Sequence, residues 1–295
     1  MSAIAKTIVA TGATSGIGFE AIKQLLLQSQ PYHYILGARD VKTTTEAYNG
    51  LQYDSAKHTI TILPLELNNM KAVKAFAQQT LEKLGSSPVD YLMLNAATGM
   101  TKKVSATGPH GSKWIEPYLV NHLSQHYLLH LLRPKLEESK ARIVVVSSGA
   151  VRMVTDTSTL EDEMLAAKET SGTVYPATKF IQFAGAHWWR RQLAGRCDVV
   201  AVSPGLIPNT GLGRGSDMVI PDGLPDAKSV PEGARSVLAA FARDDFPEDP
   251  DRLFLTSWGE WWPKDLYPLS LDRDLQDRWS PSREAIEREE GVHVA

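Results

Sequence analysis

Tyr175 and Lys179 are the residues of this 295-residue sequence whose types and spacing point most directly to chemistry. They lie four residues apart in a segment with a helical pattern, so both side chains project from the same face of that helix. A free phenol, with a pKa of about 10, is a poor acid or base at neutral pH, but a nearby ammonium group stabilises the phenolate and lowers that pKa. The pair therefore predicts a general acid/base, although a tyrosine and a lysine at this spacing also occur by chance as a surface pair.

A glycine-rich turn near the start of the chain is suited to bind a pyrophosphate. It spans residues 11–18, reads TGATSGIG, and stands between a short apolar strand pattern and a helical pattern. Glycine permits a tight turn and a close approach of the backbone to phosphate, and the N–H groups at the start of a helix stabilise the negative charge. Three glycines at the first strand-to-helix junction therefore favour a dinucleotide site over an ordinary connecting turn.

The end of the second strand pattern bears on the choice between NAD and NADP. It reads LGARD, which places Arg39 and Asp40 where the adenosine ribose of a dinucleotide would lie. An acidic residue there accepts hydrogen bonds from a free 2′-hydroxyl, whereas Arg39 offers a cationic fork to a 2′-phosphate. The sequence therefore favours NADP(H). One alternative is left open, in which Arg39 is a solvated surface charge and Asp40 binds the ribose.

Short apolar strand patterns alternate with amphipathic helical patterns along most of the chain. The expected strands are residues 7–10, 34–36, 59–63, 91–94, 143–146 and 199–202. Helical patterns long enough to cross back over a sheet lie between them, for example at residues 19–28, 70–84, 118–132 and 177–193. This alternation predicts an α/β fold: a doubly wound parallel sheet in a three-layer αβα arrangement, with ligands at the carboxyl ends of the strands.

Length and composition fit a single domain, residues 1–295, and disfavour several classes of function. The net charge of −3 gives no reason to expect nucleic acid or a membrane as a partner, and no apolar stretch approaches the roughly 20 residues that span a bilayer. Cys197 is the single cysteine, so no internal disulfide can form. Because the start of the chain also lacks the pattern of a secretory signal, we expect a cytoplasmic protein.

Two segments of unusual composition lie in the second half of the chain. Residues 203–231 are rich in glycine, proline and aspartate, and we expect them to form a loop region over the substrate. Residues 251–295 form a C-terminal extension with four tryptophans and a charged helical run at residues 282–290. We expect these tryptophans to pack on the sheet edge or on another subunit rather than to bind a ligand.

Taken together, these features resemble the short-chain dehydrogenase/reductase family, and in particular fungal NADP-dependent ketoreductases of secondary metabolism. The resemblance covers about residues 6–210 and depends on four motifs, which are the spacing Gly-x-x-x-Gly-x-Gly in the turn, Ser-Ser after the fifth strand pattern, Tyr-x-x-x-Lys, and Ser-Pro-Gly after the sixth. It implies a Rossmann-like domain. Two segments depart from the family pattern: residues 94–97 read LNAA where the family has Asn-Asn-Ala-Gly, and Glu66 replaces an aspartate.

The resemblance also implies roles for individual residues. Tyr175 would be the general acid/base, Lys179 would tune it and contact the nicotinamide ribose, and Ser148 would hold the substrate oxygen. Its neighbour Ser147 would face the other way, as adjacent residues on a strand do. Asn121 would complete a proton relay through water. Besides Tyr175 and Lys179, the residues expected to contact the cofactor are Gly12, Thr14, Ser15, Gly16, Ile17, Gly18, Arg39, Glu66, Leu67, Asn95, Ala96, Pro204, Gly205 and Ile207.

The expected function is the NADPH-dependent reduction of a ketone or aldehyde to an alcohol, with an apolar or aromatic ketone as the expected small-molecule substrate. NADPH would deliver hydride to the carbonyl carbon while Tyr175 donates a proton to an oxygen that is also hydrogen-bonded by Ser148. Two alternatives stay open. One is a non-redox isomerase or pericyclase on the same scaffold, and the other is a non-catalytic NADP-binding sensor.

His122, His126 and His130 form the remaining candidate cluster, since they recur every four residues on one helical face. They could suggest a metal site, but no acidic or cysteine partner lies nearby in sequence, so we expect packing or solvated residues and no metal. Members of the family commonly pair through the helices that follow the fourth and fifth strands. The resemblance therefore implies a homodimer or homotetramer, unless the C-terminal extension blocks that contact.

Overall fold

A parallel sheet runs through the structure, a computed structural model that describes residues 4–99, 107–166, 174–208, 210–213, 224 and 226–292. Within these residues the sheet has seven strands in the order β3-β2-β1-β4-β5-β6-β7. They are β1 (Lys6–Thr11), β2 (Tyr32–Ala38), β3 (Thr59–Pro64), β4 (Tyr91–Leu94), β5 (Arg142–Val146), β6 (Asp198–Val202) and β7 (Phe254–Leu255). The six predicted strands and the predicted doubly wound α/β fold are confirmed. The seventh strand has only two residues, too few to give a sequence pattern.

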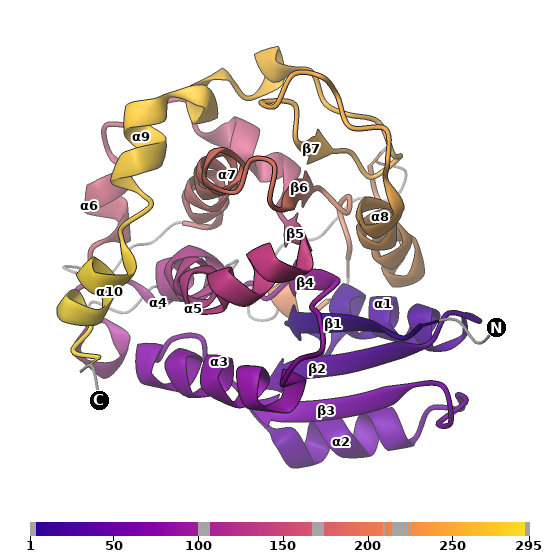
Figure 1. Ribbon diagram of the computed structural model, residues 1–295. Coiled ribbons are helices and arrows are strands. Elements are labelled where there is room, and N and C mark those ends of the chain that lie inside the picture. Colours follow the sequence, from indigo (N-terminus) through magenta and orange to yellow (C-terminus); the bar gives the residue numbers. More distant parts are fainter. Residues whose placement is uncertain are drawn as a thin grey trace.

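Helices cover both faces of the sheet (Figure 1). Helices α1 (Gly16–Leu26), α2 (Val41–Asn49) and α8 (Val230–Ala242) lie on one face, and α3 (Met70–Leu84), α5 (Ser124–Ser139) and α7 (Tyr175–Gln192) lie on the other. Successive residues of a strand point to opposite faces, so on β1 Ile8 and Ala10 enter the first core and Val9 enters the second. The chain order reverses between β1 and β4, and at such a switch point a doubly wound fold binds its ligand.

Capping residues determine where the helices α3 and α8 begin. The predicted helix at residues 70–84 is confirmed to the residue, because Asn69 caps its first turn and Gly85 leaves it with a φ of 52°. Helix α8 begins at a capping box formed by Ser229 and Glu232, inside the predicted loop region. The rest of that region is irregular where it is described, and residues 209, 214–223 and 225 lie outside the described residues.

The predicted helix at residues 118–132 is a composite. It begins with α4 (Glu116–Tyr118), continues through a π-helical turn, η2 (Leu119–Leu123), and then becomes α5. Gln125 donates hydrogen bonds from Nε2 to the carbonyl oxygens of Val120 and Asn121, at 3.0 and 3.1 Å, and so helps satisfy groups that the wider turn displaces. Asn121 therefore stands in a distorted turn that the side chain of Gln125 supports.

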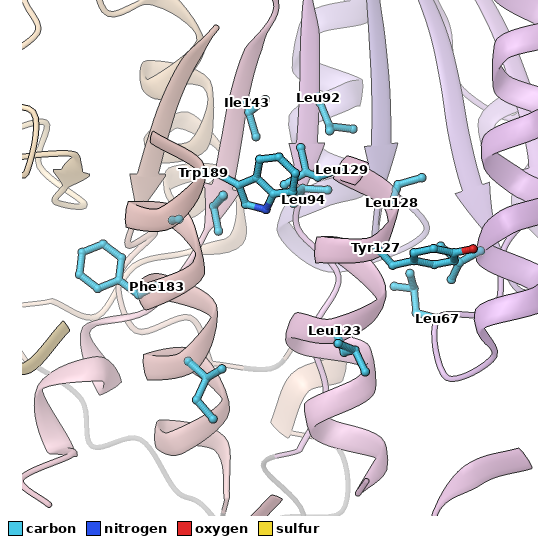
Figure 2. Close-up of a cluster of buried hydrophobic side chains, with 14 of the residues drawn as sticks. Leu67, Leu92, Leu94, Leu123, Tyr127, Leu128, Leu129, Ile143, Phe183 and Trp189 are labelled. Carbon is cyan, nitrogen blue, oxygen red and sulfur yellow. The ribbon is translucent and has the colours of Figure 1, made fainter. Parts of the chain in front are cut away.

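The larger core lies between the sheet and the helices α3, α5 and α7 (Figure 2). Trp189 extends from α7 toward α5 and is almost fully buried. Its indole Nε1 donates to Nδ1 of His126 at 2.9 Å. Phe183 projects from the other side of α7 and packs on Phe254 of β7 with ring centroids 4.5 Å apart. Helix α7 is thus fixed on both sides, which matters because Tyr175 and Lys179 lie on it.

The C-terminal extension packs along α5 and α7 through the helices α9 (Arg273–Arg278) and α10 (Arg283–Glu289) (Figure 1). His122 donates from Nε2 to the carbonyl oxygen of Trp279 at 2.6 Å, and Nε2 of His126 lies 2.9 Å from the carbonyl oxygen of Pro281. His130 lies 3.2 Å from that same oxygen. His122 and His126 are buried and His130 is half-buried, so the three histidines pack against the extension, which is the first of the two roles predicted for them.

The tryptophans of the extension divide between buried and exposed positions. Trp262 is buried against Phe254 of β7, and the neighbouring Trp261 forms a β-bridge with the same strand. Trp279 is buried against Tyr118. Trp258, in contrast, is 54% exposed. Packing on the sheet edge is thus confirmed for Trp262, while Trp279 packs on the helical layer.

The remaining elements of the described residues are short helices. They are η1 (Pro109–Gly111), η3 (Gly149–Met153), α6 (Leu160–Met164), η4 (Gly211–Gly213), η5 (Lys264–Leu266) and η6 (Pro268–Leu271). In the described part of the chain, no helix combines the length and the apolar character needed to cross a bilayer.

Candidate active site

The glycine-rich turn connects β1 to α1 at the switch point of the sheet. Gly12 and Gly16 have φ values of +65° and +56°, a region that disfavours side chains. A Cβ on Gly18 would lie 2.2 Å from the carbonyl oxygen of Gly12, which itself accepts a hydrogen bond of 2.7 Å from Nδ2 of Asn95. Each glycine is thus required either by its conformation or by close packing.

The start of α1 keeps its N–H groups available to an anion. Ser15 is the N-cap residue and makes no side-chain capping hydrogen bond. Thr14 and Ser15 are both exposed, and Ile17 is half-buried where it packs against Gly233 of α8. A phosphate at a helix N-terminus is bound by N–H groups that have no partner within the helix and by the positive end of the helix dipole.

Arg39 and Asp40 differ in what their side chains are free to do. Asp40 caps α2: Oδ1 accepts from the backbone N–H of Thr43 at 2.9 Å and Oδ2 from its hydroxyl at 2.7 Å. These hydrogen bonds hold the pKa of Asp40 below its usual value. Arg39 is exposed at the end of β2. Both oxygens of Asp40 are thus engaged in the cap of α2.

The ends of β3 and β4 contribute mainly through their backbones. Glu66 is half-buried beyond β3, whereas the side chain of Leu67 belongs to the core, so only its backbone could face a cofactor (Figure 2). Beyond β4, the backbone N–H groups of Asn95 and Ala96 both donate to Oγ1 of Thr11, at 3.1 and 3.2 Å. This hydroxyl ties the end of β4 to the glycine-rich turn.

The segment after β6 approaches the same region from the other side. Pro204 is buried and Gly205 has a φ of +91°. A Cβ on Gly205 would lie 2.9 Å from the backbone oxygen of Asp226, so a larger residue would not fit. Ile207 packs on Gly233 together with Ile17. The segment is therefore anchored to α8 and, through Ile17, to the glycine-rich turn.

Tyr175 and Ser148 come together from α7 and from the end of β5. Tyr175 is 7% exposed at the first position of α7, and its hydroxyl is hydrogen-bonded to that of Ser148. Ser148 is the N-cap of η3 and also accepts from the N–H of Ala150 at 3.2 Å. The neighbouring Ser147 is buried, and its hydroxyl has no hydrogen-bond partner in the described structure. The two neighbouring serines thus have different surroundings, and only Ser148 contacts Tyr175 among the described residues.

Burial sets the acidity of Tyr175. Desolvation raises the pKa of its phenol to about 12, and the hydrogen bond from Ser148 lowers it only in part. The predicted lowering of this pKa by Lys179 is therefore wrong, because desolvation outweighs the stabilising contacts of the phenolate. The ammonium nitrogen lies 5.8 Å from the centroid of the phenol ring. At neutral pH the phenol carries its proton.

Lys179 is held under the site, one helical turn beyond Tyr175. It is 1% exposed, and its Nζ donates to the carbonyl oxygen of Val146 at 2.9 Å and to Oε1 of Gln182 at 3.0 Å. Burial lowers the pKa of Lys179 to about 7. The lysine therefore connects α7 to the end of β5, where Ser148 follows.

Asn121 uses its side chain to join two segments of the site. Its Oδ1 accepts from the N–H of Thr98 at 2.8 Å, and its Nδ2 donates to the carbonyl oxygen of Thr98 and to Oγ1 of Thr178, at 2.8 and 2.9 Å. Thr178 lies between Tyr175 and Lys179. The side chain of Asn121 thus joins the Thr98 segment to α7.

Sequence reasoning did not find Gln182, Gln125 or Thr178, although each contacts a residue of the site. Gln182 had a detectable signal, because it is a lone amide on a helical stretch that otherwise reads Phe-Ile-x-Phe-Ala. Within the described part of the chain, no three or more His, Cys, Asp or Glu side chains are arranged so that they could hold a metal ion. Three features fit the phosphate groups of a dinucleotide: the close packing of the glycines, the N–H groups at the start of α1 and the exposed guanidinium of Arg39.

Comparisons with known proteins agree with this geometry. A family model described as short chain dehydrogenase matches residues 6–160. A short-chain dehydrogenase/reductase of Pestalotiopsis microspora is 58% identical over 288 residues, which are 96% of this chain and 98% of that protein. The human WW domain-containing oxidoreductase is 33% identical over 153 residues, half of this chain and 34% of that protein.

Solved structures show the same fold. The NADPH-bound carbonyl reductase from chicken fatty liver superimposes with a TM-score of 0.66 at 21% identity, covering 88% of this chain and 94% of that one. The carbonyl reductase Sniffer of Drosophila melanogaster gives a TM-score of 0.63 at 19% identity, covering 88% of this chain and 99% of that one. From the family match and the fungal relative, we conclude that this chain belongs to the short-chain dehydrogenase/reductase family and is an oxidoreductase with its Rossmann-like fold.

Proposed function

We propose that this chain is an NADPH-dependent carbonyl reductase that converts a ketone or aldehyde to an alcohol. The observation that carries the proposal is the hydroxyl pair of Tyr175 and Ser148, held at the carboxyl end of β5 with Lys179 beneath it. Two hydroxyls that meet at one point can both bind a carbonyl oxygen, which is where negative charge develops during reduction.

The chain's own groups would move the proton and orient the substrate. Bound NADPH would supply the hydride. Tyr175, protonated at neutral pH, would donate its proton to the carbonyl oxygen while Ser148 donates a hydrogen bond to it. Lys179 would stabilise the resulting phenolate and use an N–H group on the nicotinamide ribose. Asn121 would fix the position of the Thr98 segment relative to α7 through its hydrogen bonds to Thr98 and Thr178.

Arg39 supports the choice of NADP(H). Its guanidinium is exposed at the end of β2, and the neighbouring Asp40 is engaged in capping α2. A guanidinium binds a 2′-phosphate through charge-assisted hydrogen bonds that NAD(H) cannot make. The solved relative from chicken carries NADPH, which agrees with this assignment.

We propose an apolar or aromatic ketone as the substrate. The fungal relatives at 58% and 33% identity, the second being the short chain dehydrogenase macD of Penicillium terrestre, are in keeping with a role in secondary metabolism. Met153 stands on η3, the segment that begins at Ser148, and is 68% exposed. A flexible apolar side chain of this kind suits an apolar ligand.

The experiment is a comparison of matched Tyr→Phe variants. NADPH consumption is followed with a panel of apolar and aromatic ketones for the wild type, Tyr175→Phe and Tyr34→Phe. Tyr34 is a suitable control because its buried hydroxyl has no hydrogen-bond partner among the described residues. We expect Tyr175→Phe to lose at least roughly a hundredfold in kcat, with little change for Tyr34→Phe.

Three other outcomes would reject the proposal. Product formed without NADPH consumption would indicate an isomerase or pericyclase on this scaffold. NADPH binding without turnover of any carbonyl would indicate a sensor. Equal activity of Tyr175→Phe and the wild type would remove Tyr175 from the reaction.

A further inference from the structure

Gln182 is a buried side chain that the proposed mechanism does not use. It lies three residues beyond Lys179 on α7, between Ile181 and Phe183, and is 5% exposed. Its Oε1 accepts a hydrogen bond from Nζ of Lys179, while its Nε2 is buried with no hydrogen-bond partner among the described residues. An apolar residue at this position would leave no buried N–H group unpaired. Burial of the Gln182 amide therefore lowers the stability of the fold, and its hydrogen bond with Lys179 is the contact that offsets this loss.

We propose that Gln182 is the positioning residue of Lys179. It holds the ammonium group in its charged form and directs it toward the nicotinamide side of the site. The proposal rests on the proposed function in treating Lys179 as the group that supports Tyr175. The residue itself touches neither the reacting atoms nor the cofactor and acts through the lysine.

The donors of Lys179 show how this positioning works. An ammonium group has three N–H bonds. One is given to the carbonyl oxygen of Val146 at 2.9 Å and one to Oε1 of Gln182 at 3.0 Å. Two fixed acceptors, one on β5 and one on α7, determine the direction of the third N–H bond. That bond remains for a ribose hydroxyl. Without Gln182 the ammonium would be held at a single point.

The same two acceptors decide whether the lysine is charged. A buried amine favours its neutral form, and hydrogen bonds to oxygen acceptors favour the ammonium. Tyr175 is the titratable group beside Lys179 on α7, with its ring centroid 5.8 Å from Nζ. The acceptor that β5 contributes, the carbonyl oxygen of Val146, carries no charge. The amide oxygen is therefore a principal support of the charge.

The test measures Lys179 itself, without turnover. The full chain is labelled with ¹³Cε-lysine and titrated by NMR, with Lys179→Arg to assign the signal. Gln182→Leu removes the acceptor at similar size, and Gln182→Glu keeps an acceptor and adds charge. His187→Leu is the control, because His187 is equally buried on α7 and its ring nitrogens have no hydrogen-bond partner in the described structure. We expect the pKa of Lys179 to fall by roughly one unit in Gln182→Leu and to rise in Gln182→Glu.

Kinetics provide the second measurement. The kcat of ketone reduction should fall by roughly tenfold in Gln182→Leu and recover in Gln182→Glu, with no change in His187→Leu. An unchanged Lys179 titration in Gln182→Leu, or an equal shift in His187→Leu, would overturn the assignment. A chain that titrates as expected but reduces no carbonyl compound would reject the proposed function and leave the role of Gln182 intact.

Discussion

Acid should weaken the fold through the three histidines of η2 and α5 that contact the C-terminal extension. His122 and His126 are 3% and 2% exposed, and all three rings face backbone carbonyl oxygens of that extension. His126 accepts from the indole of Trp189 through Nδ1 and donates through Nε2, so its neutral ring is fully used. A second proton on that ring would break the Trp189 contact. Protonation of His126 would therefore weaken the packing of α5 against α7.

The sign and size of the effect follow from His122. Burial lowers its pKa from 6.5 to about 4, so the unfolded chain binds a proton at a higher pH than the folded chain does. Stability from this group is complete above pH 6.5, falls with pH between 6.5 and about 4, and is lost below. At about pH 5 the loss is about 2 kcal/mol for His122 alone. Burial also lowers the pKa of His130 to about 4, and because the rings touch, the row titrates as a coupled group.

Urea unfolding at about pH 7.5, 6 and 5 checks this expectation. The variant His122→Gln removes one titrating ring and keeps an N–H donor for the carbonyl oxygen of Trp279. Its free energy of unfolding should depend on pH less steeply than that of the wild type, by about 2 kcal/mol between pH 7.5 and 5. His33→Gln, at an exposed histidine, is the control and should follow the wild type. Parallel pH dependences of the wild type and His122→Gln would refute the reasoning.

Four further outcomes are expected. Arg39→Ala should weaken NADPH binding by at least about tenfold and leave NADH binding unchanged, as fluorescence titration would show; equal weakening would remove its phosphate role. Gly18→Ala should lower both NADPH affinity and the melting temperature, because its Cβ would lie 2.2 Å from the backbone oxygen of Gly12. Ser148→Ala should reduce kcat by about a hundredfold while Ser147→Ala does not, and similar losses in steady-state assays would contradict the separation of the two serines. Light scattering should give the monomer mass of 32.4 kDa, since the extension covers the outer faces of α5 and α7; a dimer mass would require another contact surface.

The sequence predicts those parts of the fold that depend on local pattern. The six longer strands are continuous apolar runs, and α3 has its own signals at both ends in Asn69 and Gly85. The meeting of Tyr175 and Ser148 follows from topology, because α7 begins at the edge of the sheet where β5 ends. Elements without a local signal were missed, such as β7, which exists only because β6 offers it a partner.

Contacts between distant segments explain the remaining differences. The π-helical turn at Asn121 depends on Gln125, whose amide also reaches the carbonyl oxygen of Ala96 beyond β4. From the sequence alone, the three histidines of η2 and α5 could be a metal site or a solvated face, and only the structure shows that the carbonyl groups of residues 279 and 281 lie against them. The carbonyl groups of residues 96, 279 and 281 are far in the sequence from the helical segments that they contact, so the local periodicity does not reveal these contacts.

Burial explains why charge proximity alone predicted the wrong acidity at the site. Desolvation acts in opposite directions on an acid and a base, so it raises the pKa of Tyr175 to about 12 and lowers that of Lys179 to about 7. The phenol is thereby kept protonated, as a proton donor must be. The lysine, in contrast, is brought to the pH at which its charge responds most to its surroundings. A single hydrogen bond, such as the one from Lys179 to Gln182, then changes the charged fraction severalfold, whereas at an ordinary lysine pKa of about 10 it would change almost nothing at neutral pH.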